Sequence, residues 1–71
     1  MSRNRANGWA EISEVCHVLK CPNGRLYRIE KVGAEWVIVT PDGRRLPGGE
    51  GVNGAKDAAE LEAIDAGDLT I

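Results

Sequence analysis

Apolar and polar residues alternate along the first two thirds of the chain in the way that is typical of strands. Short segments rich in Pro, Asn, Asp and Gly separate the alternating stretches and favour tight turns. One such segment is Cys21-Pro22-Asn23-Gly24, and another is Thr40-Pro41-Asp42-Gly43. The pattern predicts strands at about 12–20, 25–32 and 35–40, with a short edge strand at 44–46.

The last third of the chain has the composition of a helix. Residues 55–66 read AKDAAELEAIDA, in which Ala, Leu and Glu have high helix propensity. Gly67 is suited to the position that follows a helix. Ala58, Leu61 and Ile64 fall within one stripe of this helix, and we expect that stripe to pack on the sheet.

The length of the chain limits it to one small domain. It has 71 residues, of which 42% are hydrophobic and none is Phe, so its core must be small. The predicted fold class is α+β, a three- to four-stranded antiparallel meander with one C-terminal helix packed on one face. We expect residues 1–8 to form a flexible basic arm and residues 9–71 to form the domain. Since no apolar run has the length of a membrane span or a secretory signal, we expect a cytoplasmic protein with free thiols.

A two-residue turn at Gly33-Ala34 would place Ile29 opposite Ile38 on the face that the helix covers. We expect Cys16 and Val18 on this same face. The other face would then mix apolar and charged side chains: Val15, His17, Leu19, Leu26, Arg28, Glu30, Val32, Val37 and Val39. Exposed apolar patches of this kind often mark partner sites. The alternative is that the ends of the chain cover this face, through Trp9, Leu69 or Ile71.

The chain has few residues of the kinds that bind metal ions or catalyse reactions, and their spacing is not that of a metal, phosphate or catalytic site. Zinc sites need four converging ligands, whereas the chain offers Cys16, His17 and Cys21 without a second pair. Neighbouring residues of a strand also point to opposite faces. A phosphate-binding glycine pattern occurs once, at 49–54, but Glu50 lies inside it and no βαβ unit frames it. The sequence therefore predicts no catalytic residues, no metal, no cofactor and a protein that is not an enzyme.

Charge is distributed unevenly along the chain. Residues 1–49 hold eight basic and five acidic side chains, and residues 50–71 hold one basic and six acidic ones. This asymmetry predicts a mildly basic sheet backed by an acidic helix, which would steer association with partners. We therefore expect a small binding module that acts through protein–protein contact. Its candidate protein-binding residues are Glu60, Glu62, Asp65, Leu19, Val37 and Val39.

One role for such a module is inhibition or regulation of a host machine. Small proteins encoded by phages or mobile elements, such as anti-CRISPR and other anti-defence inhibitors, act in this way, and the acidic helix would suit a basic channel on the target. A homodimer, through an exposed edge strand or the second sheet face, is another arrangement that the pattern allows.

The alternative function is nucleic-acid binding through the basic side of the sheet, for which Tyr27 and Trp36 could supply stacking if they were exposed. The candidate residues are Arg25, Arg28, Arg44 and Arg45. The stretches Tyr27-Arg28-Ile29 and Trp36-Val37-Ile38-Val39, followed by a turn and a helix with Ala58, Ala59 and Leu61, resemble the arm-binding domains of phage integrases. That resemblance implies a sheet that reads the major groove with the helix packed behind it. The net charge of −2 favours a protein partner instead.

Overall fold

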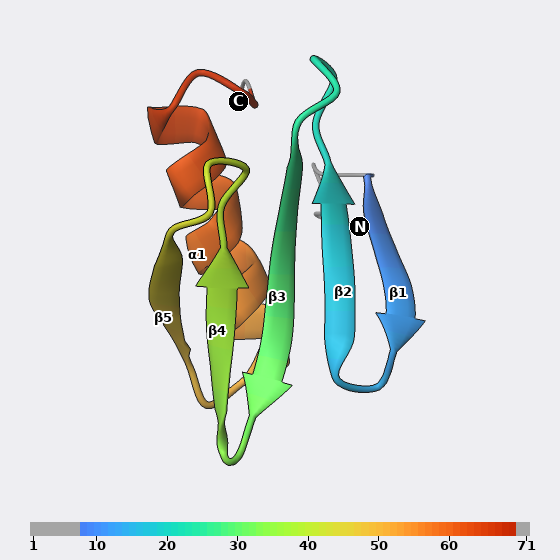
Figure 1. Ribbon diagram of the computed structural model, residues 1–71, viewed down its shortest axis with the longest axis vertical. Coiled ribbons are helices and arrows are strands. Elements are labelled where there is room, and N and C mark those ends of the chain that lie inside the picture. The colour runs from blue at the N-terminus through green and yellow to red at the C-terminus, as the bar shows by residue number, and fades with distance from the viewer. Residues whose placement is uncertain (1–7, 70–71) are drawn as a thin grey trace.

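A computed structural model describes residues 8–69 as five strands and one helix (Figure 1). The elements are β1 (Trp9–Ser13), β2 (Cys16–Lys20), β3 (Leu26–Val32), β4 (Glu35–Val39), β5 (Arg45–Gly49) and α1 (Val52–Asp65). The strands form one sheet in chain order, and every neighbouring pair is antiparallel. The predicted α+β meander with one C-terminal helix is therefore confirmed, with five strands in place of three to four. The predicted basic arm, 1–8, lies outside the described residues except for Gly8.

The additional strand arises because the predicted strand at 12–20 covers the end of β1 and all of β2, and β1 begins earlier, at Trp9. β1 and β2 are joined by a turn at Glu14-Val15, where the Ser13 hydroxyl oxygen accepts a hydrogen bond from the Val15 amide at 3.2 Å. The prediction missed this turn because the turn contains no Gly, Pro, Asn or Asp. At the other edge of the sheet, β5 stays paired with β4 as far as Gly49 and is longer than the predicted 44–46.

The turns that contain Pro-Asn-Gly and Pro-Asp-Gly share one backbone geometry. In the first turn, the Cys21 amide donates to the Arg25 carbonyl at 2.9 Å, and the Gly24 amide donates to the Cys21 carbonyl at 2.9 Å. The corresponding groups of residues 40–44 make the same two hydrogen bonds. Gly24 and Gly43 have φ values of 91° and 93°, in the left-handed region that favours glycine. Each turn therefore ends in a bulge that leaves an odd number of residues between the paired strands.

This odd loop reverses the faces that were predicted for β2. His17 and Leu19 face the helix, while Cys16 and Val18 lie on the opposite face. The prediction was wrong because it assumed an even number of residues in the turn, and a shift of one residue exchanges the two faces of a strand. Leu19 is fully buried, which removes it from the candidate protein-binding residues. The register of β3 with β4 is as predicted.

α1 packs on the sheet through small side chains. Its fully buried residues are spaced by one helical turn: Ala55, Ala59 and Ala63. Of the predicted stripe, Ala58 is partly buried against the core, but Ile64 is only half-buried and Leu61 is 65% exposed, so the stripe was placed on the wrong side of the helix. The sheet supplies the bulky part of the core, so the helix can approach it closely only where its own side chains are small. The bulky core residues are Leu19, Tyr27, Ile29, Trp36 and Ile38.

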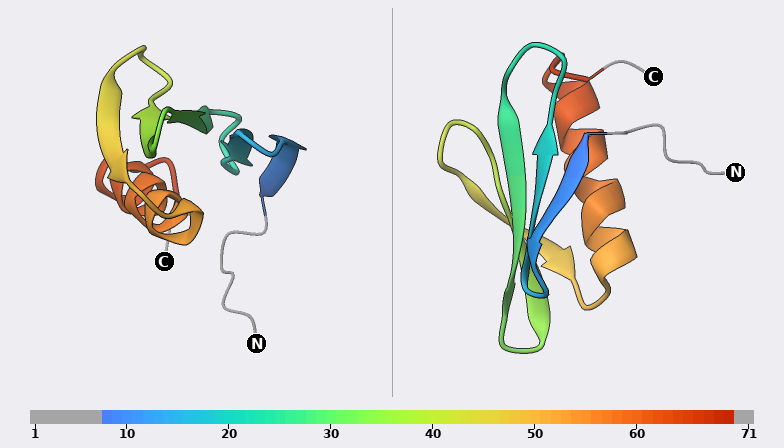
Figure 2. Two further views of the ribbon diagram at one scale, coloured as in Figure 1. Left: turned by 90° about the horizontal axis from the view of Figure 1, so that it is seen from below. Right: turned by 90° about the vertical axis from the view of Figure 1, so that its right-hand side faces the viewer.

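α1 covers one face of the sheet, where it contacts β3, β4 and β5 (Figure 2). Trp9 and Leu69 also pack against the core on the helix side. These two residues therefore do not cover the opposite face, contrary to the alternative considered for the chain ends, and Ile71 lies outside the described residues. The opposite face of the sheet is left without a covering element among residues 8–69.

The packing of α1 can be tested by two substitutions. We expect Leu61→Ala to change the free energy of unfolding by no more than about 0.5 kcal/mol, because this side chain already lies in solvent. Ala59→Leu should cost about 1–3 kcal/mol, because a larger side chain forces the helix away from the sheet. Urea unfolding followed by circular dichroism measures both values. A larger loss for Leu61→Ala than for Ala59→Leu would contradict the packing.

Candidate protein-binding surface

The sheet face that α1 leaves uncovered, called the open face below, points toward the viewer in Figure 1. Alternation along the paired strands fixes which side chains lie on it. Val37 and Val39, two of the predicted protein-binding residues, are half-buried there. The open face includes Ala10, Cys16, Val18, Lys20, Leu26, Arg28, Glu30, Val32, Glu35, Val37, Val39, Arg45 and Pro47.

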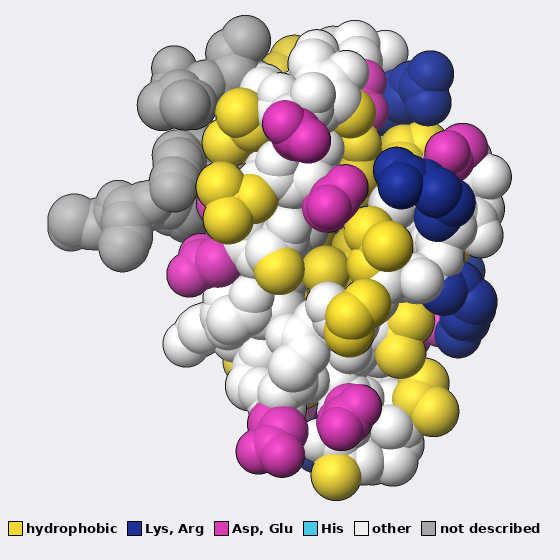
Figure 3. Space-filling model, turned by 90° about the vertical axis from the view of Figure 1, so that its left-hand side faces the viewer, with side chains coloured by type: hydrophobic (Ala, Val, Ile, Leu, Met, Phe, Trp, Pro, Cys, Tyr) yellow, Lys and Arg dark blue, Asp and Glu magenta, His cyan; other side chains and the backbone are white. Residues whose placement is uncertain are grey.

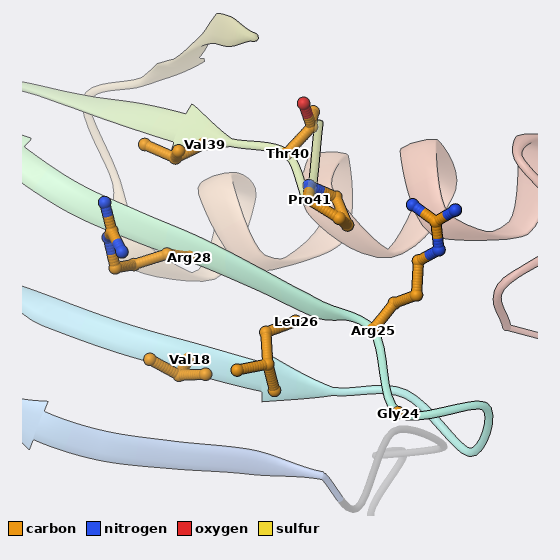
Figure 4. A pocket seen from close by; sticks show the side chains of 8 residues that line it. All are labelled: Val18, Gly24, Arg25, Leu26, Arg28, Val39, Thr40 and Pro41. Carbon is orange, nitrogen blue, oxygen red and sulfur yellow. The ribbon is translucent and has the colours of Figure 1, made fainter. Parts of the chain in front are cut away.

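One end of the open face is hollowed between the two Pro-Asx-Gly turns. The hollow has a volume of about 420 Å³, and Arg28 and Arg25 extend on either side of it (Figure 4). Its floor is apolar and is formed by Val18, Leu26, Val39 and Pro41. An apolar hollow with cationic side chains at its rim is suited to an aliphatic side chain that has a carboxylate beside it.

The arginines of the open face are held by weak ion pairs. Arg28 Nε lies 2.6 Å from Glu30 Oε2, and Arg45 Nη2 lies 3.9 Å from Glu30 Oε1. The side chains of Arg28 and Arg45 are 46% and 58% exposed. Exposed ion pairs of this kind contribute only about 0–1 kcal/mol. A carboxylate of a partner could therefore replace Glu30 beside either arginine at little cost.

The two turns at this end of the sheet repeat the pattern Pro-Asn/Asp-Gly-Arg, which sequence reasoning missed. The third turn residue is Asn23 in the first turn and Asp42 in the second. Their different hydrogen bonds explain why one is an amide and the other a carboxylate. Asn23 Nδ2 donates to Asp68 Oδ1 at 2.9 Å, which an ionised aspartate could not do. Asp42 instead accepts a hydrogen bond from the Thr40 hydroxyl and lies 3.1 Å from Arg44 Nε. The Thr40 hydroxyl, with Arg44, holds the pKa of Asp42 below its usual range.

Asp68 connects this end of the sheet to the end of α1. Its Oδ2 accepts a hydrogen bond from the Tyr27 hydroxyl at 2.7 Å, and Arg25 Nε lies 3.7 Å from Oδ1. The Asp68 amide donates to the Ala63 carbonyl at 2.8 Å, which closes the helix C-terminus. The hydrogen bonds from Tyr27 and Asn23 hold the pKa of Asp68 below its usual range, and burial together with Asp68 raises the pKa of Tyr27. Sequence reasoning missed Asp68 because no local pattern links it to a turn 45 residues away.

The predicted protein-binding residues of the helix lie in different environments. Glu60 is buried and accepts a hydrogen bond from Trp9 Nε1 at 2.8 Å, so it belongs to the fold rather than to an outer surface. The Glu62 carboxylate lies 4.0 Å from Arg44 Nη2, beside the second turn. Asp65 is exposed at the end of the helix. Acidic side chains remain on the outer surface of α1, while Lys and Arg gather toward the sheet (Figure 3).

The residues predicted for nucleic-acid binding are also divided between two places. Arg28 and Arg45 lie on the open face, whereas Arg25 and Arg44 follow the two turns. Tyr27 and Trp36, which would have to be exposed in order to stack on bases, lie buried beneath α1. The described part of the open face therefore presents aliphatic and charged side chains and no aromatic ring.

The described residues include few side chains that could bind a metal ion or act as a nucleophile or base. Within residues 8–69, no three His, Cys, Asp or Glu side chains are grouped so that they could hold a metal ion. Cys16 and Cys21 are free, and burial, with Asp68 nearby, raises the pKa of the Cys21 thiol. His17 packs against Trp36 on the covered face, with 5.7 Å between the ring centroids. The one described helix, α1, is not long and apolar enough to cross a membrane.

Comparison of the chain with known proteins finds no matching family model, no matching curated protein and no matching solved structure. The resemblance to the arm-binding domains of phage integrases therefore stays a prediction from the sequence pattern.

The Asp68 contacts predict an effect of exchanging the amide and the carboxylate in the two turns. Asn23→Asp should lower the melting temperature by roughly 5 °C at neutral pH, because it places a second carboxylate beside Asp68 in place of a donor. Asp42→Asn is the matched control, since its amide oxygen can still accept the Thr40 hydroxyl, and it should shift the melting temperature much less. Thermal unfolding followed by circular dichroism compares the two variants. Equal shifts would contradict the account.

The effect of Asn23→Asp should also depend on pH. Because the pKa of Asp68 is lowered by folding, its contribution to stability is fully present above the ordinary carboxyl pKa of about 4 and is lost as the pH falls through the folded-state value. At roughly pH 3 a protonated carboxyl can again donate, so the difference between the variant and the parent should shrink. A difference that grows on acidification would contradict this assignment.

Proposed function

We propose that the protein is a small non-enzymatic binding module that acts through protein–protein contact, with the open face as its docking surface. The observation that carries the proposal is the exposed apolar hollow, floored by Val18, Leu26 and Val39 and flanked by Arg25 and Arg28. This arrangement favours a partner segment that presents aliphatic side chains next to carboxylates.

Burial of the apolar side chains of the open face would contribute favourable free energy to binding. Fully burying one Val or Leu side chain contributes about 1.5–3 kcal/mol. Leu26 is 51% exposed, and Val18 and Val39 are half-buried, so a partner could gain a substantial part of that value at each position. The exposed arginines at the rim would add specificity for acidic groups and a faster, salt-dependent association.

The surface chemistry supports a protein partner over a nucleic acid. The two sheet aromatics that would stack on bases, Tyr27 and Trp36, are buried. Glu30 lies between Arg28 and Arg45, where it would repel a phosphate backbone. The chain carries a net charge of −2, which also opposes binding to a polyanion.

A module that acts by contact can block a larger machine by occupying one of its binding surfaces. We propose inhibition or regulation of a host machine, of the anti-CRISPR type, as the role of this contact. Its support is the docking surface described above.

Site-specific photo-crosslinking tests the proposed docking surface. The photo-reactive residue p-benzoylphenylalanine replaces Leu26 on the open face in one variant and Leu61 on the outer surface of α1 in a control, since both positions are exposed. In a lysate of the host cells, at dilute concentration, we expect the Leu26 variant to give an adduct with one defined protein. The additional change Arg28→Glu/Arg45→Glu should abolish that adduct, because it reverses the charge around Glu30.

The controls separate the competing surfaces and partner classes. An adduct from the Leu61 variant and none from the Leu26 variant would move the docking surface to the helix and contradict the proposal. An adduct from the Leu26 variant that disappears on nuclease treatment would indicate a nucleic acid instead. Circular dichroism melts of all variants show that each is folded before its adducts are compared.

A further inference from the structure

The outer surface of α1 carries a second exposed apolar position that the fold does not use. Leu61 is 65% exposed and lies on the side of the helix opposite the buried alanines. Asp57 and Asp65 lie one helical turn before and after it on the same surface, and both are exposed. The helix therefore presents a ridge in which one leucine stands between two carboxylates. This ridge, Asp57-Leu61-Asp65, is called the helix ridge below.

The helix ridge has the chemistry that the open face is suited to receive. The hollow offers an apolar floor between two guanidinium groups, those of Arg25 and Arg28. Arg25 directly precedes β3 and Arg28 lies in it, so an extended backbone places their Cα atoms about 10 Å apart, and the two carboxylate positions of the ridge are about 12 Å apart along the helix axis. Leu61 could therefore enter the hollow while each aspartate approaches an arginine.

The lengths of the elements also match. α1 has 14 residues and a length of about 21 Å, and β3 has 7 residues and a length of about 23 Å. A helix laid on the open face would therefore contact it over the whole length of the central strand. The sheet would then be covered by a helix on both faces, which is a common stable arrangement of layers.

We infer that a second copy of this chain docks its helix ridge on the open face, with Leu61 in the hollow beside Val39. The inference rests on the proposed function in that it uses the same docking surface. Each copy contributes two different surfaces, so the contact is head-to-tail. Every copy in such an assembly, except the last, has its open face occupied. Self-association would therefore compete with binding of another protein and release the docking surface on dilution.

Sedimentation velocity of the full chain tests the inference. We expect the average mass to rise above 7.6 kDa with increasing protein concentration at low ionic strength. It should return to that of the monomer at roughly 0.5 M salt, because salt screens the exposed charge pairs. A monomer at every concentration in low salt would overturn the inference.

A matched pair of apolar substitutions locates the contact. Leu61→Ser removes the side chain that would fill the hollow, and we expect it to weaken self-association by roughly tenfold or more. Ile12→Ser is the control, because Ile12 is 64% exposed, close to the 65% of Leu61, but lies on edge strand β1. Association that is lost with Ile12→Ser and kept with Leu61→Ser would overturn the inference and indicate pairing of edge strands.

Charge reversal tests the head-to-tail geometry. Arg28→Glu/Arg45→Glu makes the open face acidic, and Asp57→Lys/Asp65→Lys makes the helix ridge basic. Neither variant should self-associate, because each would place like charges against one another. A mixture of the two variants should associate again, since the native helix ridge of one fits the native open face of the other. A mixture that stays monomeric would overturn the head-to-tail contact.

Sedimentation tests this inference and the photo-crosslink tests the proposed function, so the two can fail separately. If the chain stays monomeric while the Leu26 photo-crosslink to another protein persists, the docking surface stands and the second copy is not its occupant. If self-association behaves as expected while no other protein is captured, the open face serves assembly of this chain alone. Loss of both results would overturn both proposals.

Discussion

One helix stabilises five strands, and it can cover only one face of their sheet. The contact between the two is close because α1 meets the sheet through Ala55, Ala59 and Ala63, while the bulky core residues come from the strands. The largest apolar side chains of the central strands that face the helix, among them Tyr27, Ile29 and Trp36, are thereby buried on one side of the molecule. Within residues 8–69, the valines and Leu26 of the other side have no covering element, and this asymmetry produces the candidate surface.

The end of the sheet where the two Pro-Asx-Gly turns meet is fixed to the helix by polar contacts. Asp68 joins the first turn, the buried Tyr27 and the helix C-terminus, so the hollow on the open face has well-positioned walls. A docking surface that is formed before binding loses less conformational entropy when a partner arrives.

Much of the fold could be predicted from the sequence, and the errors have physical causes. Alternation and turn residues located β3, β4 and the helix, because these elements are marked by local patterns. The turn at Glu14-Val15 has no such mark, and the bulge at Gly24 adds one residue that reversed the faces of β2. The helix stripe was misplaced because large residues were assigned to the core, whereas the sheet needed small ones against it. Asp68 depends on contacts between segments far apart in the sequence, which no local pattern records.

We propose that the open face binds protein and not nucleic acid. Its arginines are paired with Glu30, its aromatic neighbours are buried, and the helix behind it is acidic. A fluorescence-anisotropy titration of labelled duplex DNA, single-stranded DNA and RNA across a range of salt concentrations tests this claim most directly. We expect no binding to any of them at low salt. Binding that weakens steeply with salt, and that is lost in the Arg28→Glu/Arg45→Glu variant, would contradict it.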